Sequence, residues 1–112
     1  MEILSERRQE ALIISFSGDL DAQTAGQAHA FIDGQLDGSQ QQVVVDLSQV
    51  GFMSSAGIRV LLDLLRKNRR MGGDLCLAAT QPGVQRTLEL AGMERVLEVY
   101  PTVDEAVLRV GA

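Results

Sequence analysis

The chain has 112 residues, a length typical of one domain, and its 46% apolar and 22% charged residues indicate a globular protein rather than a disordered one. A net charge of −5 argues against nucleic-acid binding, which depends on a basic surface. One cysteine, Cys76, excludes an internal disulfide and a cysteine-cluster zinc site. The sequence shows no signal-peptide pattern and no apolar run near ~20 residues, so we expect a single cytoplasmic domain over residues 1–112, without membrane association.

Short apolar runs predict the strands of a sheet. In chain order these runs are 11–16, 43–45, 75–79 and 96–100, with a further edge strand over residues 2–7. The β-branched run 43–45 is typical of a central parallel strand that is buried on both faces. Cys76 lies inside the run 75–79, where we expect it to act as a small buried hydrophobe rather than a reactive thiol.

Helical periodicity between these runs predicts four helices. Two capping boxes, Thr24 with Gln27 and Thr102 with Glu105, mark the first and last of them. A short helix begins at Pro82 and ends at Gly92, and the central helix covers residues 55–70. The residues expected to face the core are Ala25, Ala28, Ile32 and Leu36; Ile58, Leu61, Leu62 and Leu65; Val84, Leu88 and Ala91; and Val103, Ala106, Val107 and Val110. The predicted fold class is α/β, with a mixed, mainly parallel sheet of four to five strands and about four helices.

The central helix has an unusual charge. Its exposed face is expected to carry Arg59, Asp63, Arg66 and Arg70, and residues 59–70 sum to +4 while the rest of the chain sums to −9. One interpretation is a solvated face with i,i+4 ion pairs such as Asp63–Lys67. The other is a basic stripe that binds an acidic partner.

Two serines stand between the strand that ends at Asp46 and the central helix. Serine is among the best N-cap residues, because its hydroxyl accepts a hydrogen bond from a backbone N–H that has no partner within the helix. Gly57 would let the first turn pack closely. One cap needs one serine, however, and the sequence supplies both Ser54 and Ser55.

The residues give no physical sign of catalysis, a cofactor or a metal site. A nucleophile elbow needs a glycine where Met53 stands, and the only histidine, His29, lies within the first helix, at the boundary of its apolar stripe. A phosphoaspartate receiver centred on Asp46 needs an acidic pair after the first strand and a late lysine, but the only lysine, Lys67, lies within a helix. We expect Asp46 to orient its loop instead.

A third possibility is that Ser55 is itself a substrate. A serine exposed at a helix N-terminus can accept a phosphoryl group, which the helix dipole and the free N–H groups then stabilise. The modification adds about −1.5 to −2 charges.

The chain resembles a known family, the single-domain anti-sigma factor antagonists of the STAS superfamily. The resemblance covers residues 11–107, and its most specific part is the serine loop. The matching stretches are Gly18-Asp19-Leu20-Asp21 with Thr24-Ala25, Val43-Val44-Val45-Asp46-Leu47-Ser48, Phe52-Met53-Ser54-Ser55-Ala56-Gly57-Ile58, and Leu88-Glu89-Leu90-Ala91-Gly92-Met93 with Asp104-Glu105-Ala106. One departure is Ser54, where many members have Asp.

The resemblance implies a partner switch. The unphosphorylated protein would bind a kinase-type anti-sigma factor, the kinase would phosphorylate Ser55 and end the complex, and a metal-dependent serine phosphatase would reset it. The implied partner-binding residues are Asp19, Asp21, Thr24, Ser54, Ser55, Ala56, Gly57, Arg59 and Asp63. Two alternatives stay open: a STAS-like scaffold or transporter-associated subunit that is never phosphorylated, and the receiver.

Overall fold

The computed structural model describes residues 1–35 and 41–110, and its centre is a five-stranded sheet in the order β1-β2-β3-β4-β5. The strands are β1 (Glu2–Arg8), β2 (Ala11–Ser17), β3 (Gln42–Gln49), β4 (Asp74–Ala78) and β5 (Val99–Tyr100). β1 pairs antiparallel with β2, and every later pairing is parallel. The predicted fold class, a mixed and mainly parallel sheet, is confirmed.

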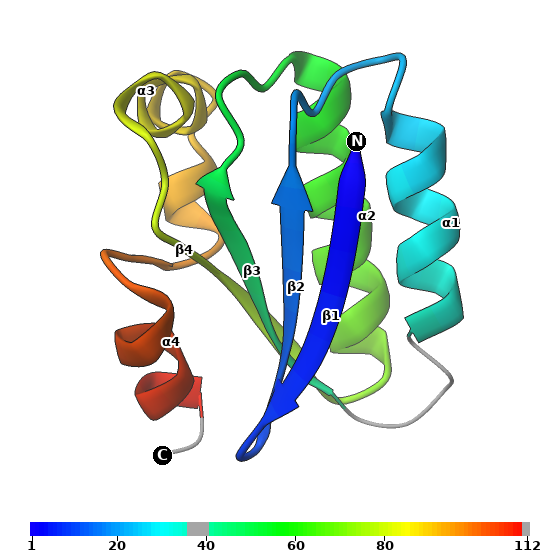
Figure 1. Ribbon diagram of the computed structural model, residues 1–112. Helices are drawn as coiled ribbons and strands as arrows, with labels where there is room; N and C mark the ends of the chain where they lie inside the picture. Colours follow the sequence, from blue (N-terminus) through cyan, green and yellow to red (C-terminus); the bar gives the residue numbers. More distant parts are fainter. Residues whose placement is uncertain (36–40, 111–112) are drawn as a thin grey trace.

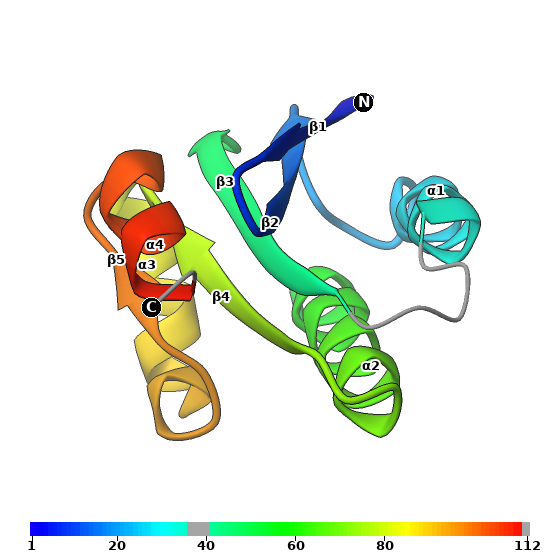
Figure 2. The same ribbon diagram turned by 90° about the horizontal axis from the view of Figure 1, so that it is seen from below.

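Helices cover both faces of this sheet. In the described residues they are α1 (Ala25–Gln35), α2 (Ser55–Arg70), α3 (Pro82–Leu90) and α4 (Val103–Val110), with a short 3₁₀ turn η1 (Met93–Arg95). Figure 1 shows β1 and β2 in front of α2, with α1 beside it. Figure 2 shows α1 and α2 on one side of the curved sheet and α4 on the other. No helix in the described part of the chain is long and apolar enough to cross a lipid bilayer.

The core is divided by the sheet into two parts. The larger part includes Phe16 on β2 and Leu61 on α2, both fully buried. The smaller part lies under α4 and includes Ile13 and Val44. Because neighbouring residues on β2 and β3 point into different parts, both strands are buried on both faces, as the β-branched run predicted.

The strands differ in length from the prediction at two places. β3 extends over eight residues, well beyond the run 43–45. β5 has only two residues, whereas a strand over 96–100 was predicted, because a 3₁₀ turn occupies the preceding chain. The turn starts after Gly92, whose φ is 71°, and Val96 N–H and Leu97 N–H both donate to the carbonyl of Met93. These bonds take Val96 and Leu97 away from the sheet.

One of the two predicted capping boxes is wrong. Thr24 Oγ accepts from the backbone N–H of Asp21 at 3.0 Å and donates to the carbonyl of Asp19 at 2.8 Å, so it ties the preceding loop instead of capping α1. The side chain of Gln27 donates to the carbonyl of Met1. The other box holds at its cap, since Thr102 Oγ accepts from the N–H of Glu105 at 3.1 Å.

The apolar stripes of the helices are mostly as predicted, with two corrections. On α2 the fully buried leucines are Leu61, Leu64 and Leu65, while Ile58 and Leu62 are half-buried, so the buried face is rotated slightly from the predicted one. Ala91 is exposed, because α3 ends at Leu90 and Ala91 is its C-cap. The predicted inward residue Leu36 lies outside the described residues.

Candidate functional site

The site is built on two loops that follow neighbouring parallel strands. The loop after β2 (residues 18–24) lies beside the loop after β3 (residues 50–54), and Leu20 and Met53 form a parallel bridge between them. Leu20 N–H donates to the carbonyl of Phe52, and Ser54 N–H donates to the carbonyl of Leu20, each at 3.0 Å. Both bridge side chains are buried, so the two loops are fixed to each other and to the core.

Ser54 is the N-cap of α2. Its backbone is extended, with φ −96° and ψ 179°, and its hydroxyl accepts from the N–H of Ala56 at 3.2 Å. The carbonyl of Ser54 accepts the first bond of the helix from Ile58 N–H at 3.0 Å. These contacts answer the question of the two serines, since the capping function belongs to Ser54 alone.

Ser55 is the first residue of α2, and its side chain is exposed. Among the residues that the structure describes, its hydroxyl has no hydrogen-bond partner. It therefore stands in solvent at the positive end of a 16-residue helix. That position suits a hydroxyl that accepts an anionic group.

Gly57 is required where α2 passes the loop after β2. A Cβ atom built on Gly57 would lie 2.5 Å from the carbonyl oxygen of Leu20 and 2.9 Å from Cγ of Met53. The contact with a backbone oxygen leaves no room for a side chain. The glycine thus lets the first turn of α2 press against the Leu20–Met53 bridge.

The loop after β2 offers one acidic side chain fully to solvent. Asp19 is exposed, whereas Asp21 and Thr24 are half-buried and bonded within the loop. Oδ1 of Asp21 accepts from the N–H groups of Gln23 and Thr24, at 2.9 and 3.2 Å. The structure therefore gives Asp21 and Thr24 a part in shaping the loop, and Asp19 a free carboxylate.

The remaining sequence-predicted site residues lie on α2. Arg59 and Asp63 are exposed, and Asp63 Oδ2 lies 3.7 Å from Nε2 of His29 on α1. The suggested pair Asp63–Lys67 is wrong, because Lys67 instead bridges to Asp33 of α1 at 2.7 Å. His29 is half-buried at the edge of the stripe of α1, as predicted.

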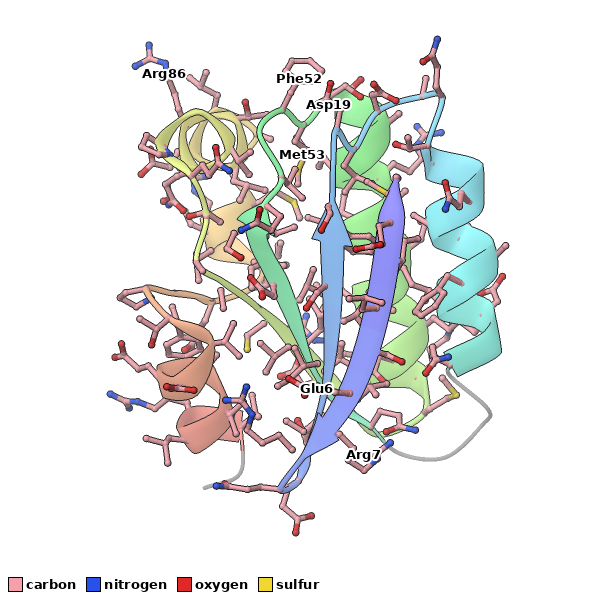
Figure 3. The ribbon with its side chains drawn as sticks, viewed as in Figure 1. Glu6, Arg7, Asp19, Phe52, Met53 and Arg86 are labelled. Atoms are coloured by element: carbon pink, nitrogen blue, oxygen red, sulfur yellow. The ribbon has the colours of Figure 1, made fainter. Side chains whose placement is uncertain are left out.

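Sequence reasoning missed Phe52 as an exposed side chain. Its exposed fraction is 53%, which is unusual for an aromatic residue held between two buried neighbours, Val50 and Met53. Figure 3 shows Phe52 and Asp19 at the same end of the molecule, with Met53 below them, nearer the sheet. The available signal was an aromatic residue in a loop that belongs to no periodic element.

Asp46 and Cys76, the candidates for a phosphoaspartate and a reactive thiol, have structural roles. Oδ1 of Asp46 accepts from the N–H of Ser48 at 2.9 Å, which orients the loop as expected. Burial, with the nearby carboxylates of Glu98 and Asp74, raises the pKa of the Cys76 thiol to about 12. The thiol is therefore neutral near pH 7, in agreement with the predicted buried hydrophobe. No cluster of metal ligands occurs within residues 1–35 and 41–110.

Comparison with known proteins identifies the family. The sequence model of the STAS domain matches residues 2–106. The chain belongs to the STAS family. This STAS protein is 27% identical over 101 residues to the anti-sigma F factor antagonist of Paenibacillus polymyxa, a match that covers 89% of the chain and 86% of the relative.

Solved structures agree with this assignment. An anti-sigma factor antagonist from Mycobacterium paratuberculosis superposes with a TM-score of 0.90 at 29% identity, over 99% of this chain and 94% of that one. The fold is also that of SpoIIAA, at 22% identity, solved unphosphorylated with a TM-score of 0.82 over 97% of this chain and 96% of that one. The phosphorylated form of SpoIIAA, described as a Bacillus cell fate determinant, superposes with a TM-score of 0.75 at 22% identity, over 97% of this chain and 99% of that one. These similarities place the STAS protein among the anti-sigma factor antagonists, a class of regulators and not of enzymes.

Proposed function

We propose that this antagonist is a phosphorylation-controlled partner switch that acts in the cytoplasm. With Ser55 unmodified it binds an anti-sigma factor that is also a serine kinase. Transfer of the γ-phosphoryl group of ATP to Ser55 Oγ releases ADP and ends the complex. A metal-dependent serine phosphatase hydrolyses the phosphoserine and restores binding.

One observation carries this proposal: the two adjacent serines have different environments. The Ser54 hydroxyl is bonded to the backbone as the helix cap, whereas the Ser55 hydroxyl is exposed and without a partner in the described residues. A kinase can therefore modify Ser55 without breaking the cap. SpoIIAA, which shares this fold, exists in a phosphorylated form, which supports the same regulation here.

The proposed partner surface surrounds this serine. It comprises Asp19, Asp21, Thr24, Ser54, Ser55, Ala56, Gly57, Arg59 and Asp63. Within it Asp19 and Arg59 present exposed charges, while Gly57 is buried and acts by letting the loops approach. We add Phe52 to this surface, because exposed aromatic side chains are frequent anchors of protein interfaces.

Incubation with ATP and the cognate anti-sigma factor, followed by intact mass measurement and peptide mapping, tests the switch. We expect one phosphate on Ser55, none on the Ser55→Ala variant, and one on the Ser54→Ala control. A hydroxylamine-labile phosphate on Asp46 would support a receiver instead. Absence of any phosphate would support a scaffold.

The role of Phe52 is tested by its replacement with alanine. We expect Phe52→Ala to weaken binding to the anti-sigma factor by about 30-fold, which corresponds to about 2 kcal/mol for an interface anchor. The matched control is Leu108→Ala, which removes another exposed apolar side chain, 66% exposed, from α4 on the other face of the sheet. Titration calorimetry measures both variants. Equal affinities for the two would exclude Phe52 from the interface.

A further inference from the structure

We infer that one face of α2 is a docking surface for an acidic segment of the anti-sigma factor, reaching well beyond the serine loop. The face consists of Arg59, Arg66 and Arg70, here named the arginine row. This inference rests on the proposed partner and adds the chemistry of a second contact region. The evidence for it is that some basic side chains of α2 have partners within the molecule and others do not.

Two of the five basic residues of α2 are bound within the molecule. Lys67 Nζ lies 2.7 Å from Oδ1 of Asp33, on α1. Arg69 Nε lies 3.1 Å from Oδ1 of Asp74, and the Arg69 guanidinium also donates to the carbonyl of Val96. These two cations connect α2 to neighbouring elements and leave little charge for another molecule.

The arginine row has no such partners. In the described part of the chain, Arg59, Arg66 and Arg70 are exposed and make no side-chain hydrogen bond or ion pair. An arginine side chain with no internal role leaves its full charge and its donors available. The sequence suggested a basic stripe with all five cations of α2, but in the described residues only the three arginines of the row are free to bind another molecule.

The three arginines line up with Ser55. At about 100° per residue, positions 55, 59, 66 and 70 fall within an arc of about 60° on the helix surface, opposite the buried leucines. The row runs about 16 Å along the axis from Arg59 to Arg70. The one carboxylate on this face, Asp63, lies beside His29, so the face keeps an excess of positive charge.

A groove accompanies the lower half of the row. It has a volume of about 290 Å³ and lies between α1 and α2, and Arg66 and Arg70 line it together with Ile32 and Leu64. Its acidic lining residues, Asp33 and Asp63, already face Lys67 and His29. An extended or helical segment with carboxylates could lie in this groove and pair with the two free guanidinium groups.

Neither nucleic acid nor a lipid bilayer suits this surface as well as an acidic protein does. A typical DNA-binding protein contacts about 6–10 phosphates, and adhesion to an anionic bilayer uses clusters of about 4–8 basic residues. Here three arginines stand on a chain of net charge −5. A short acidic segment needs only two or three cations to pair with. Because the arginine row lies on the same face of α2 as Ser55, this segment of the partner would lie next to the region that binds Ser55.

The test compares two double charge reversals with the same net charge. Arg66→Glu with Arg70→Glu alters the row, and Arg86→Glu with Arg109→Glu alters exposed arginines of α3 and α4; each pair takes the net charge from −5 to −9. Figure 3 shows Arg86 on α3, at the side of the molecule away from α1. Stopped-flow association with the purified anti-sigma factor is measured at about 20 mM and 500 mM salt, with a thermal melt of each variant.

We expect the row variant to associate about tenfold more slowly at low salt and within about twofold of wild type at high salt, where screening is strong. The control pair should stay within about threefold of wild type at both. Equal slowing by both pairs, or none by either, would overturn the docking surface. So would binding of a 20-base-pair DNA duplex that the row variant loses while its association with the protein is unchanged. Failure of the wild-type chain to bind would instead overturn the proposed function, and this inference with it.

Discussion

The variant Ser55→Ala should bind the anti-sigma factor persistently in the presence of ATP, whereas phospho-Ser55 and Ser55→Asp should bind at least a hundredfold more weakly. Ser55 lies at the centre of the proposed surface, with its hydroxyl in solvent. A dianion brought into a protein interface must lose its hydration, and Arg59 offsets only one of its two charges, so the other is repelled where the partner presents no cation. A hundredfold loss corresponds to about 2.7 kcal/mol, within the reach of one unpaired charge.

The free protein should tolerate the same phosphate. The helix N-terminus stabilises an anion by about 0.3–1 kcal/mol, and at most by ~2. Arg59 lies one turn further along α2, at the i,i+4 spacing at which opposite charges attract. Phosphorylation should therefore act on binding and leave folding almost unchanged.

Titration calorimetry and a thermal melt of each form measure both effects. The matched control is Ser54→Asp, which adds a similar charge one residue earlier and keeps a good N-cap. We expect it to bind within about tenfold of wild type. Binding of Ser55→Asp as tight as that of wild type, or a phospho-Ser55 protein that melts many degrees lower, would contradict the mechanism.

Gly57→Ala should be strongly destabilising, although it adds only one methyl group. The added methyl group meets the carbonyl oxygen of Leu20 at 2.5 Å, and this oxygen also accepts the bond from Ser54 N–H. To make room, α2 must move away from the Leu20–Met53 bridge. Overpacking of this kind costs about 3 kcal/mol, which lowers the melting temperature of a chain this size by roughly 10–15 °C.

Gly26→Ala is the matched control for this substitution. Gly26 also lies in a helix, α1, but a Cβ atom there meets nothing within 4 Å. Alanine is the better helix former, so we expect a gain of up to about 1 kcal/mol. Opposite shifts of the two melting curves would identify the close approach as the cause, and a Gly57→Ala protein that melts with wild type would exclude it.

Much of the fold was readable from the sequence because the signals were local. Short apolar runs predicted where the strands lie along the chain, and the pair Ser54–Ser55 marked the start of α2. The capping residue Thr102 was recognised because its partner, Glu105, is three residues away. The resemblance to anti-sigma factor antagonists added the family, which the comparisons confirm.

What the sequence could not show depends on contacts between distant segments. Thr24 matched a capping box, but in the structure its hydroxyl is hydrogen-bonded to an N–H and a carbonyl group of the preceding loop instead. The shortness of β5 depends on the turn at Met93, and the partners of Lys67 and Asp63 come from another helix. The bridge of Leu20 with Met53 joins residues that no local pattern connects.

That bridge has a consequence for the entropy of recognition. Fixing one residue of a flexible loop costs about 1–2 kcal/mol, so ordering the five residues 50–54 would take about 5–10 kcal/mol from the affinity of a mobile loop. Here the hydrogen bonds from Leu20 and Ser54 meet that cost when the chain folds. The partner therefore encounters a surface that already has its binding conformation. An unfolded copy of the chain lacks the bridge, so it cannot compete with the folded protein for the partner.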